Sequence, residues 1–300
     1  MSEIFIPMPN INDLKLYLEQ KFDGFFIGLE NFSSNFNYAL KIDELDEYLD
    51  IINKSNKKSF ICFNRLMYND ELDGLKEVIN ILKTKDITGV CFTDIGTLEL
   101  LRELEFDKEI LWFSNHLGTN SNTIKFLNKR DVNYFLLSTE ITKDEIINIK
   151  NNCPNQKIGC MLYGFLNTAT SSRKLLSNYF AYIDKEKNKD KYIIKDQVKN
   201  NDYILVENKN TNFFTGSVLN GIKFYPELIK NNIDFIYLDD YMLDSKNFYN
   251  VIEAFSSLRN APEDEKFINT LEEVVNHNTS YDCYYGFLDK KTVFKVEDYE

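Results

Sequence analysis

Polar side chains stand directly after several apolar runs of the sequence, at the points where predicted strands end. Glu140 follows the run 132–137 and is the best candidate for a catalytic group, because a carboxylate beside a buried strand is costly unless it is used or paired. Arg173 is its natural partner, since a guanidinium can hold a carboxylate through two hydrogen bonds. The same pair also suits a purely structural role, and both interpretations stay open. The other candidates, expected to line the site or bind substrate, are Glu30, Asn64, Asp94, Asn115, Tyr163 and Asp239.

A hydroxyl-rich segment supplies further candidate substrate ligands. Residues 157–180 contain an apolar run, then small hydroxyl residues, two basic residues and an apolar pair. The pattern predicts a buried strand, a polar loop that includes Ser171 and Ser172, and the start of a helix. Proteins of the α/β class place their chemistry at such loops, although an ordinary strand-to-helix connection has the same pattern.

The familiar hydrolytic and nucleotide-binding motifs are missing from the sequence. The two histidines, His116 and His277, are far apart and outside any HExxH pattern, and there is no GxSxG, Walker or GxGxxG segment. A Cys–His pair would require Cys160 to lie near His116, and nothing in the local sequence indicates this. We therefore expect a loop role for His116 and no nucleophile–base pair.

Composition limits the class of protein and its partners. The 300 residues are 43% hydrophobic and 27% charged, with a net charge of −12. No apolar run approaches the ~18 residues of a membrane span, and the N-terminal segment lacks signal-peptide features, so we expect a cytoplasmic protein. An acidic surface disfavours DNA, and any RNA role needs a local basic patch or a partner. Five cysteines are an odd count in a chain without an export signal, which predicts reduced thiols, and the lack of CxxC spacing predicts no metal site.

Strand-like and helix-like segments alternate along most of the chain. Seven such units are followed by a late one, 234–238 with its helix, which gives eight. This alternation predicts a (β/α)8 TIM-like barrel over residues 1–260, in preference to an open doubly wound sheet. The repeat breaks at about 184–218, where short strands predict a small antiparallel β insert before the last unit. The insert's lysines alternate with acids, which favours a solvated loop over an RNA contact. Residues 261–300 form an acidic C-terminal extension, expected to pack on the barrel.

The segment 157–180 also resembles the signature of the collagenase-like peptidases, family U32. The signature's glycine and its later Ser, Arg, Leu and Ser positions correspond to Gly164, Ser171, Arg173, Leu176 and Ser177. Its ionisable and thiol positions are changed: the glutamate is Gly159, the histidine is Tyr163, and the two cysteines are Asn167 and Lys174. This combination resembles the shorter of the paired family members of low-GC bacteria.

The resemblance implies several functions, which stay open at this point. Some relatives carry a four-cysteine iron–sulfur cluster, but the changes at Asn167 and Lys174 imply that none is bound here. The short paired members imply a role in tRNA wobble-uridine hydroxylation, with prephenate as a candidate small-molecule ligand. Such a subunit would work with a longer paralogue and contact tRNA through it. The alternatives are a collagenase-like peptidase and a non-catalytic scaffold barrel. In the implied pocket Arg173 would hold an anion, and Tyr163 would orient a ligand but serve poorly as a base.

Overall fold

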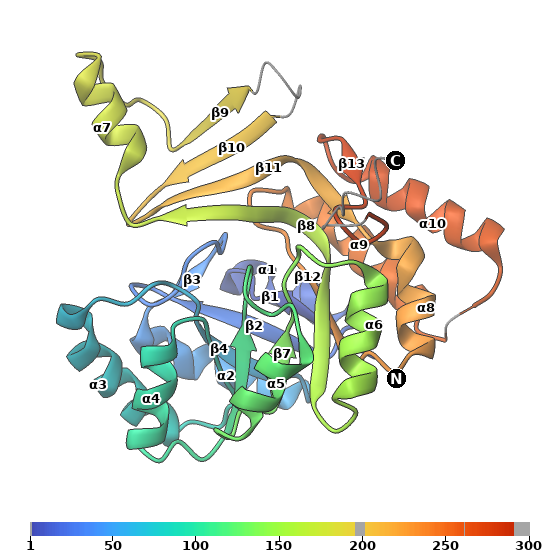
Figure 1. Ribbon diagram of the computed structural model, residues 1–300, viewed down its shortest axis with the longest axis horizontal. Coiled ribbons are helices and arrows are strands. Elements are labelled where there is room, and N and C mark those ends of the chain that lie inside the picture. The colour runs from blue at the N-terminus through green and yellow to red at the C-terminus, as the bar shows by residue number, and fades with distance from the viewer. Residues whose placement is uncertain (1, 196–201, 261, 291–300) are drawn as a thin grey trace, which may run out of the picture.

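Eight parallel strands close into a barrel, as the sequence predicted. The computed structural model describes residues 2–195, 202–260 and 262–290. The barrel strand β12 pairs with both β1 and β8, which closes the sheet, and the fold class is confirmed (Figure 1). The barrel strands are β1 (Glu3–Pro7), β2 (Gly24–Leu29), β4 (Lys58–Phe63), β5 (Gly89–Phe92), β6 (Glu109–Phe113), β7 (Tyr134–Leu136), β8 (Lys157–Ser171) and β12 (Phe235–Leu238).

Helices connect these strands and cover the outside of the barrel. A capping box begins α6: Thr142 N–H donates to Glu145 Oε2 at 2.8 Å, and Glu145 N–H donates to Thr142 Oγ1 at 3.2 Å. The helices are α1 (Ile11–Leu18), α2 (Leu45–Lys54), α3 (Leu72–Lys83), α4 (Ile95–Glu103), α5 (Ser121–Asn128), α6 (Lys143–Asn152), α8 (Tyr225–Lys230) and α9 (Ser245–Ser257). A short strand β3 (Ala39–Leu40) and the 3-10 turns Ile42–Glu44, Asn69–Glu71 and Ile222–Phe224 complete the connections.

Aromatic rings fill the interior of the barrel. Phe5 stacks on Phe26 with 5.3 Å between ring centroids and meets Phe235 edge-on at 5.5 Å. Glycine makes room for these rings, because a Cβ on Gly159 would lie 2.4 Å from the Phe235 ring. The interior is therefore packed solid, and any chemistry must take place at its mouth.

Strand β8 continues far beyond the barrel. Its first part pairs with β7 and β12, and its outer part pairs antiparallel with β11 (Thr211–Asn220). The change of direction occurs at Gly164, whose φ of +124° a residue with a side chain rarely adopts. The sequence predicted a polar loop after the barrel part of this strand, and that prediction is wrong as far as Ser171. Thr170 and Ser171 are strand residues that pair with Asn212 and Thr211 of β11. β-branched threonines suit a strand once a partner strand is available.

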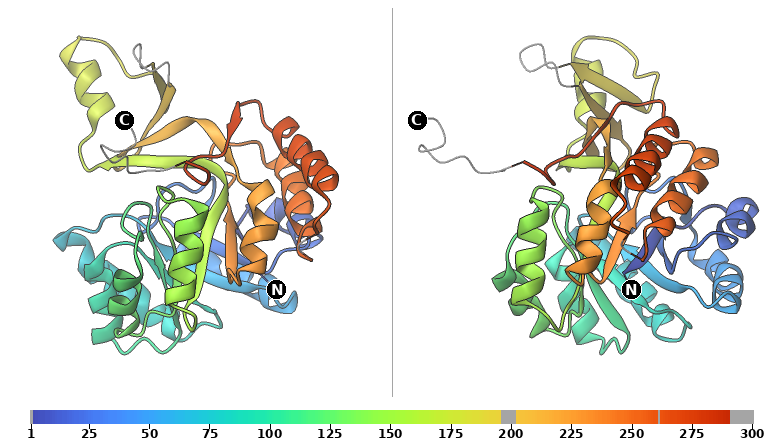
Figure 2. Two further views of the ribbon diagram at one scale, coloured as in Figure 1. Left: turned by 45° about the vertical axis from the view of Figure 1, so that its right-hand side comes forward. Right: turned by 90° about the vertical axis from the view of Figure 1, so that its right-hand side faces the viewer.

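The insert is a four-stranded antiparallel sheet that extends from the barrel mouth (Figures 1 and 2). It consists of outer β8, β11, β10 (Asp202–Glu207) and β9 (Lys191–Lys195), in that order, with α7 (Leu175–Tyr182) beside it. It thus begins within β8, well before the predicted residue 184, because one continuous strand serves both sheets.

The C-terminal extension lies along the last barrel unit and the base of the insert (Figure 2). Helix α10 (Glu265–His277) packs beside α9, and Asn220 Nδ2 donates to Asn276 Oδ1 at 2.8 Å. The two-residue strand β13 (Cys283–Tyr284) adds to β11 in parallel. Within the described residues, no helix has both the length and the apolar character that crossing a membrane demands.

Candidate functional site

Two adjoining cavities lie at the mouth of the barrel, below the insert. The central cavity is small, about 20 Å³, and the lateral cavity beside it measures about 230 Å³. Three asparagines, Asn35, Asn64 and Asn115, line both cavities. They come from the loops after β2, β4 and β6, so the carboxyl ends of separate strands build one site.

The side-chain amides of these asparagines differ in whether they have hydrogen-bond partners within the protein. Asn64 is fixed by Ser34, whose N–H donates to Asn64 Oδ1 at 2.9 Å and whose carbonyl accepts from Nδ2 at 3.0 Å. Asn35 has a φ of +63°, and its Oδ1 is buried without a hydrogen-bond partner in the described part of the chain. Asn37 ties this loop to the end of β12 through its Nδ2, 2.7 Å from the Asp240 carbonyl. Asn35 is therefore held in place while its acceptor stays free.

Asp239 is the carboxyl group that lines the central cavity. It follows β12, is 9% exposed, and accepts a hydrogen bond from Tyr241 N–H at 3.0 Å. Burial, followed by the neighbouring charge of Asp240, raises the pKa of Asp239 to about 8. Burial also raises the pKa of Asp240 to about 7, while Tyr17, 3.3 Å away, donates a hydrogen bond that opposes the shift. At neutral pH Asp239 thus holds a proton that it can donate.

Glu140 does not occupy the buried position that the sequence analysis assumed. Its side chain is 47% exposed in a turn after β7, and Oε1 lies 3.4 Å from Nδ1 of His116. His116 lies in a loop, as expected, and lines the lateral cavity, whereas Glu140 is outside both cavity linings. The described ion pairs of Glu140 include His116 and not Arg173, so the predicted Glu140–Arg173 pair is not formed.

Tyr163 and Asp94 have structural surroundings away from the cavities. The Tyr163 side chain is 1% exposed and stacks on Phe248 of α9, with 6.0 Å between ring centroids. Burial raises the pKa of its phenol further above the ordinary value. Asp94 begins α4, where its Oδ1 accepts from Gly96 N–H at 2.7 Å.

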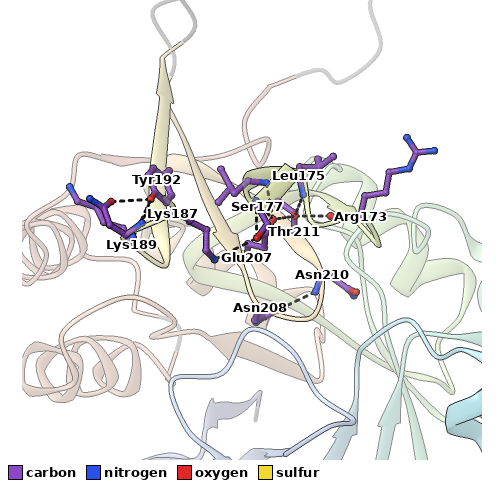
Figure 3. Close-up of polar contacts among 12 residues, drawn as sticks. Arg173, Leu175, Ser177, Lys187, Lys189, Tyr192, Glu207, Asn208, Asn210 and Thr211 are labelled. Atoms are coloured by element: carbon purple, nitrogen blue, oxygen red, sulfur yellow. Dashed lines mark hydrogen bonds and ion pairs between the residues drawn. The ribbon is translucent and has the colours of Figure 1, made fainter. Parts of the chain in front are cut away.

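Ser171 ends β8, and Ser172 and Arg173 connect it to α7, outside the linings of both cavities. Figure 3 shows Arg173 beside the first turn of α7. Ser171 Oγ accepts from Arg173 N–H at 3.2 Å, and Thr211 Oγ1 donates to the Arg173 carbonyl at 2.8 Å. The side chains of Ser172 and Arg173 are exposed. Of the predicted site residues, the cavities therefore bring together Asn64, Asn115 and Asp239.

Glu207 anchors the first turn of α7, and this buried carboxylate was missed from the sequence (Figure 3). It accepts hydrogen bonds from Leu176 N–H at 2.7 Å, from Ser177 N–H at 3.1 Å and from the Ser177 hydroxyl. Burial alone would raise the pKa of Glu207, but these bonds and that from Thr211 hold it below its ordinary value. The retained signature serine Ser177 is part of this anchor.

The family of the chain follows from its match to known proteins. The model of peptidase family U32 matches residues 9–296. The chain belongs to peptidase family U32. It is 23% identical to the tRNA hydroxylation protein P2 of Bacillus subtilis strain 168, over 97% of this chain and 99% of that protein. It is also 23% identical to tRNA hydroxylation protein P1 of that organism, over 61% of this chain and 43% of the relative. Among solved structures, a U32 peptidase has a TM-score of 0.47 at 10% identity, covering 55% of this chain and 70% of that one.

Two changed positions of the U32 signature, Gly159 and Tyr163, are packed in the barrel wall. Gly159 stands at the glutamate position, and the space a glutamate side chain would need is filled by the Phe235 ring. Cys160 on the same strand is buried, which raises the pKa of its thiol to about 12. In the described part of the chain, no three His, Cys, Asp or Glu side chains gather as metal ligands.

Proposed function

We propose that this U32 chain is a supporting subunit in tRNA wobble-uridine hydroxylation and acts together with a longer U32 paralogue. The main support for this proposal is the sequence similarity to tRNA hydroxylation protein P2, which covers 97% of this chain and 99% of the relative. The same bacterium has a protein P1, of which the match spans only 43%. Two family members of unequal length in one organism support a paired arrangement. A tRNA substrate implies a cytoplasmic location.

The chemistry of the barrel mouth supports a positioning role better than hydrolysis. Its cavities offer amide groups and a protonated carboxyl, Asp239, which donate and accept hydrogen bonds. A cysteine peptidase needs an activated thiolate, but burial raises the thiol pKa values of Cys91, Cys153 and Cys160. The peptidase alternative therefore rests on the family name.

The residues at the mouth do not fit prephenate, which carries two carboxylates. Arg65 is the one Lys or Arg among the residues that line the two cavities. It is 4% exposed and already bound to the Glu71 carboxylate, and its Nε donates to the Asn31 carbonyl at 2.9 Å. Two anionic groups would thus enter a site without a free cation, close to Asp239. In the proposed pair, prephenate belongs to the longer paralogue.

The charge distribution is consistent with tRNA binding that is shared between two chains. The net charge of −12 disfavours tRNA binding by this chain alone. Residues 165–220, however, hold nine Lys and Arg against six Asp and Glu. The insert therefore carries a small positive charge, unlike the chain as a whole, and in the proposed pair the partner supplies most of the phosphate contacts.

Mass spectrometry of tRNA nucleosides tests the proposed function. A strain that lacks this gene, and any parallel oxygen-dependent pathway, is expected to lose its 5-hydroxyuridine derivatives. The wild-type gene should restore them, and a strain without the longer paralogue should show the same loss. Unchanged 5-hydroxyuridine derivatives in the deletion strain would end the proposal.

A further inference from the structure

Strand β9 forms the outer edge of the insert sheet (Figure 1). Its residues Lys191–Lys195 pair antiparallel with β10, and in the described part of the chain no strand pairs with the other side of β9. The outer side of an edge strand presents a row of unpaired N–H and C=O groups, to which a further strand can add. The edge is therefore a binding surface made of main-chain groups.

Two large apolar side chains of β9 are exposed. Ile193 is 56% exposed and Ile194 is 48% exposed. Side chains alternate along a strand, so these two isoleucines lie on opposite faces of the sheet. On the face of Ile194, the Tyr192 ring packs on Phe180 of α7, with 4.9 Å between ring centroids. On the other face Ile193 pairs with Ile204 of β10, which is 1% exposed. A strand added at this edge would cover both isoleucines, one on each face.

A lysine stands at each end of β9, on the same face as Ile193. Lys195 is 77% exposed and lies 3.9 Å from Asp202, where an exposed ion pair contributes little. The ammonium group of Lys191 donates to the Tyr281 hydroxyl at 2.9 Å. Because an ammonium group has three donors, Lys191 can also bind a carboxylate. A segment that pairs with β9 therefore meets two cations with an apolar residue between them.

Neither a second copy of this chain nor a nucleic acid matches this edge. In the symmetric antiparallel register that pairs the whole strand, Lys191 of one copy would lie opposite Lys195 of the other. Like charges directly opposite across a sheet are destabilising, and lysines on edge strands prevent such pairing. A nucleic acid would neutralise the lysines, but it would leave the main-chain groups of β9 unpaired and the isoleucines uncovered.

We propose that β9 is a docking strand for an extended acidic segment of another protein, which adds to the insert sheet as a further antiparallel strand. The pairing positions define this segment: carboxylates lie opposite Lys191 and Lys195, and an apolar residue lies opposite Ile193. Since alternate residues face one side, the segment has the pattern acid–x–apolar–x–acid. A β-branched residue at each x position suits a strand and covers the Ile194 face. The inference concerns this edge alone and is independent of the function proposed above.

Peptides of defined sequence test the docking strand on the full-length chain. The probe is the fluorescein-labelled peptide Gly-Glu-Thr-Val-Thr-Glu-Gly. One matched peptide has lysine in place of both glutamates, and another carries N-methyl groups on its central amides, which removes their main-chain donors. We expect saturable fluorescence anisotropy with the acidic peptide and affinity weaker by about threefold to tenfold for the lysine peptide. The N-methylated peptide should not bind. Hydrogen exchange of residues 191–195 should slow when the acidic peptide is bound.

Charge reversal on β9 should reverse the preference between the two peptides. Lys191→Glu/Lys195→Glu should weaken binding of the acidic peptide by about threefold to tenfold, because two cross-strand charge pairs become repulsive. The same variant should bind the lysine peptide more tightly than wild type does, which shows that its edge strand is intact. Lys125→Glu/Lys129→Glu is the matched control, with the same charge change and spacing at exposed positions of α5 and its C-cap. It should leave both affinities unchanged.

Several results would overturn the inference. The acidic peptide could fail to bind saturably, or the lysine or N-methylated peptide could bind equally well. Slow hydrogen exchange of residues 191–195 in a wild-type dimer, lost on dilution, would assign the edge to a second copy instead. A tRNA transcript that binds wild type and not Lys191→Glu/Lys195→Glu, without any binding of the acidic peptide, would assign the two lysines to RNA.

Discussion

Replacement of Asp239 by asparagine should make the protein less sensitive to alkaline pH. Asp239 and Asp240 stand side by side at the end of β12, 9% and 6% exposed. Asparagine has the shape of a protonated aspartate, and its Oδ1 can keep the hydrogen bond from Tyr241 N–H. The variant therefore preserves the packing and removes a group that can ionise.

The sign of the effect follows from the direction of the pKa shift. The pKa of Asp239 rises from an ordinary value of 3.8 to about 8, so the folded chain keeps a proton that the unfolded chain releases. The stabilisation is complete below pH ~4 and is lost as the pH rises towards 8. One proton corresponds to about 1.4 kcal/mol per pH unit. The stability advantage of Asp239→Asn over wild type should thus grow by up to about 4 kcal/mol between pH 5 and pH 8, or roughly 10 °C in Tm.

Urea and thermal unfolding followed by circular dichroism at pH 5, 6, 7 and 8 provide the measurement. The matched control is Asp289→Asn, which changes an exposed carboxylate and should give a stability difference from wild type that does not vary with pH. If the difference between Asp239→Asn and wild type is also constant from pH 5 to pH 8, then Asp239 is ionised in the folded protein. The assignment of a proton-holding group at the barrel mouth would then be wrong.

Three further predictions concern the insert, the barrel interior and iron. Glu207→Ala removes the acceptor for the first turn of α7 and should destabilise that helix by about 1–3 kcal/mol, seen as faster limited proteolysis of α7 while the barrel unfolds unchanged. Gly159→Glu should prevent soluble folding because of the Phe235 ring, and Phe235→Ala in the same chain should restore part of the soluble yield. Protein purified anaerobically should contain no iron or sulfide by chemical assay, because Asn167 and Lys174 replace two signature cysteines.

Local sequence patterns predicted the barrel well and the insert less well. Each barrel unit is a continuous segment of the sequence, in which an apolar strand is followed by an amphipathic helix. The periodicity of the apolar residues is therefore enough to predict it. The outer part of β8 is different, because Thr170 and Ser171 become strand residues only through pairing with β11, some 40 positions later. Such non-local pairing overrides the local preference of hydroxyl residues for turns.

The candidate site was predictable where a residue directly follows a strand. Asp239 and Asn64 do so, and both line the barrel mouth. Asn35 was missed because it lies in the middle of a loop after β2, at a position fixed by tertiary contacts of that loop. The Glu140–Arg173 pair failed for a related reason, since the turn after β7 directs Glu140 towards His116 in a neighbouring loop. Loop conformation, and not residue type, decides these contacts.

The signature residues that this chain keeps share one structural task. Gly164 turns β8 out of the barrel, and Ser171 and Ser177 hold the start of α7. Outer β8 and β11 in turn place Thr170 and Asn210 in the lining of the lateral cavity. The positions that lost their ionisable side chains instead pack, Gly159 under Phe235 and Tyr163 against α9. The packing at Gly159 and Tyr163 leaves no room there for the glutamate and histidine of the signature. This supports the proposal that the oxidative chemistry belongs to the longer partner.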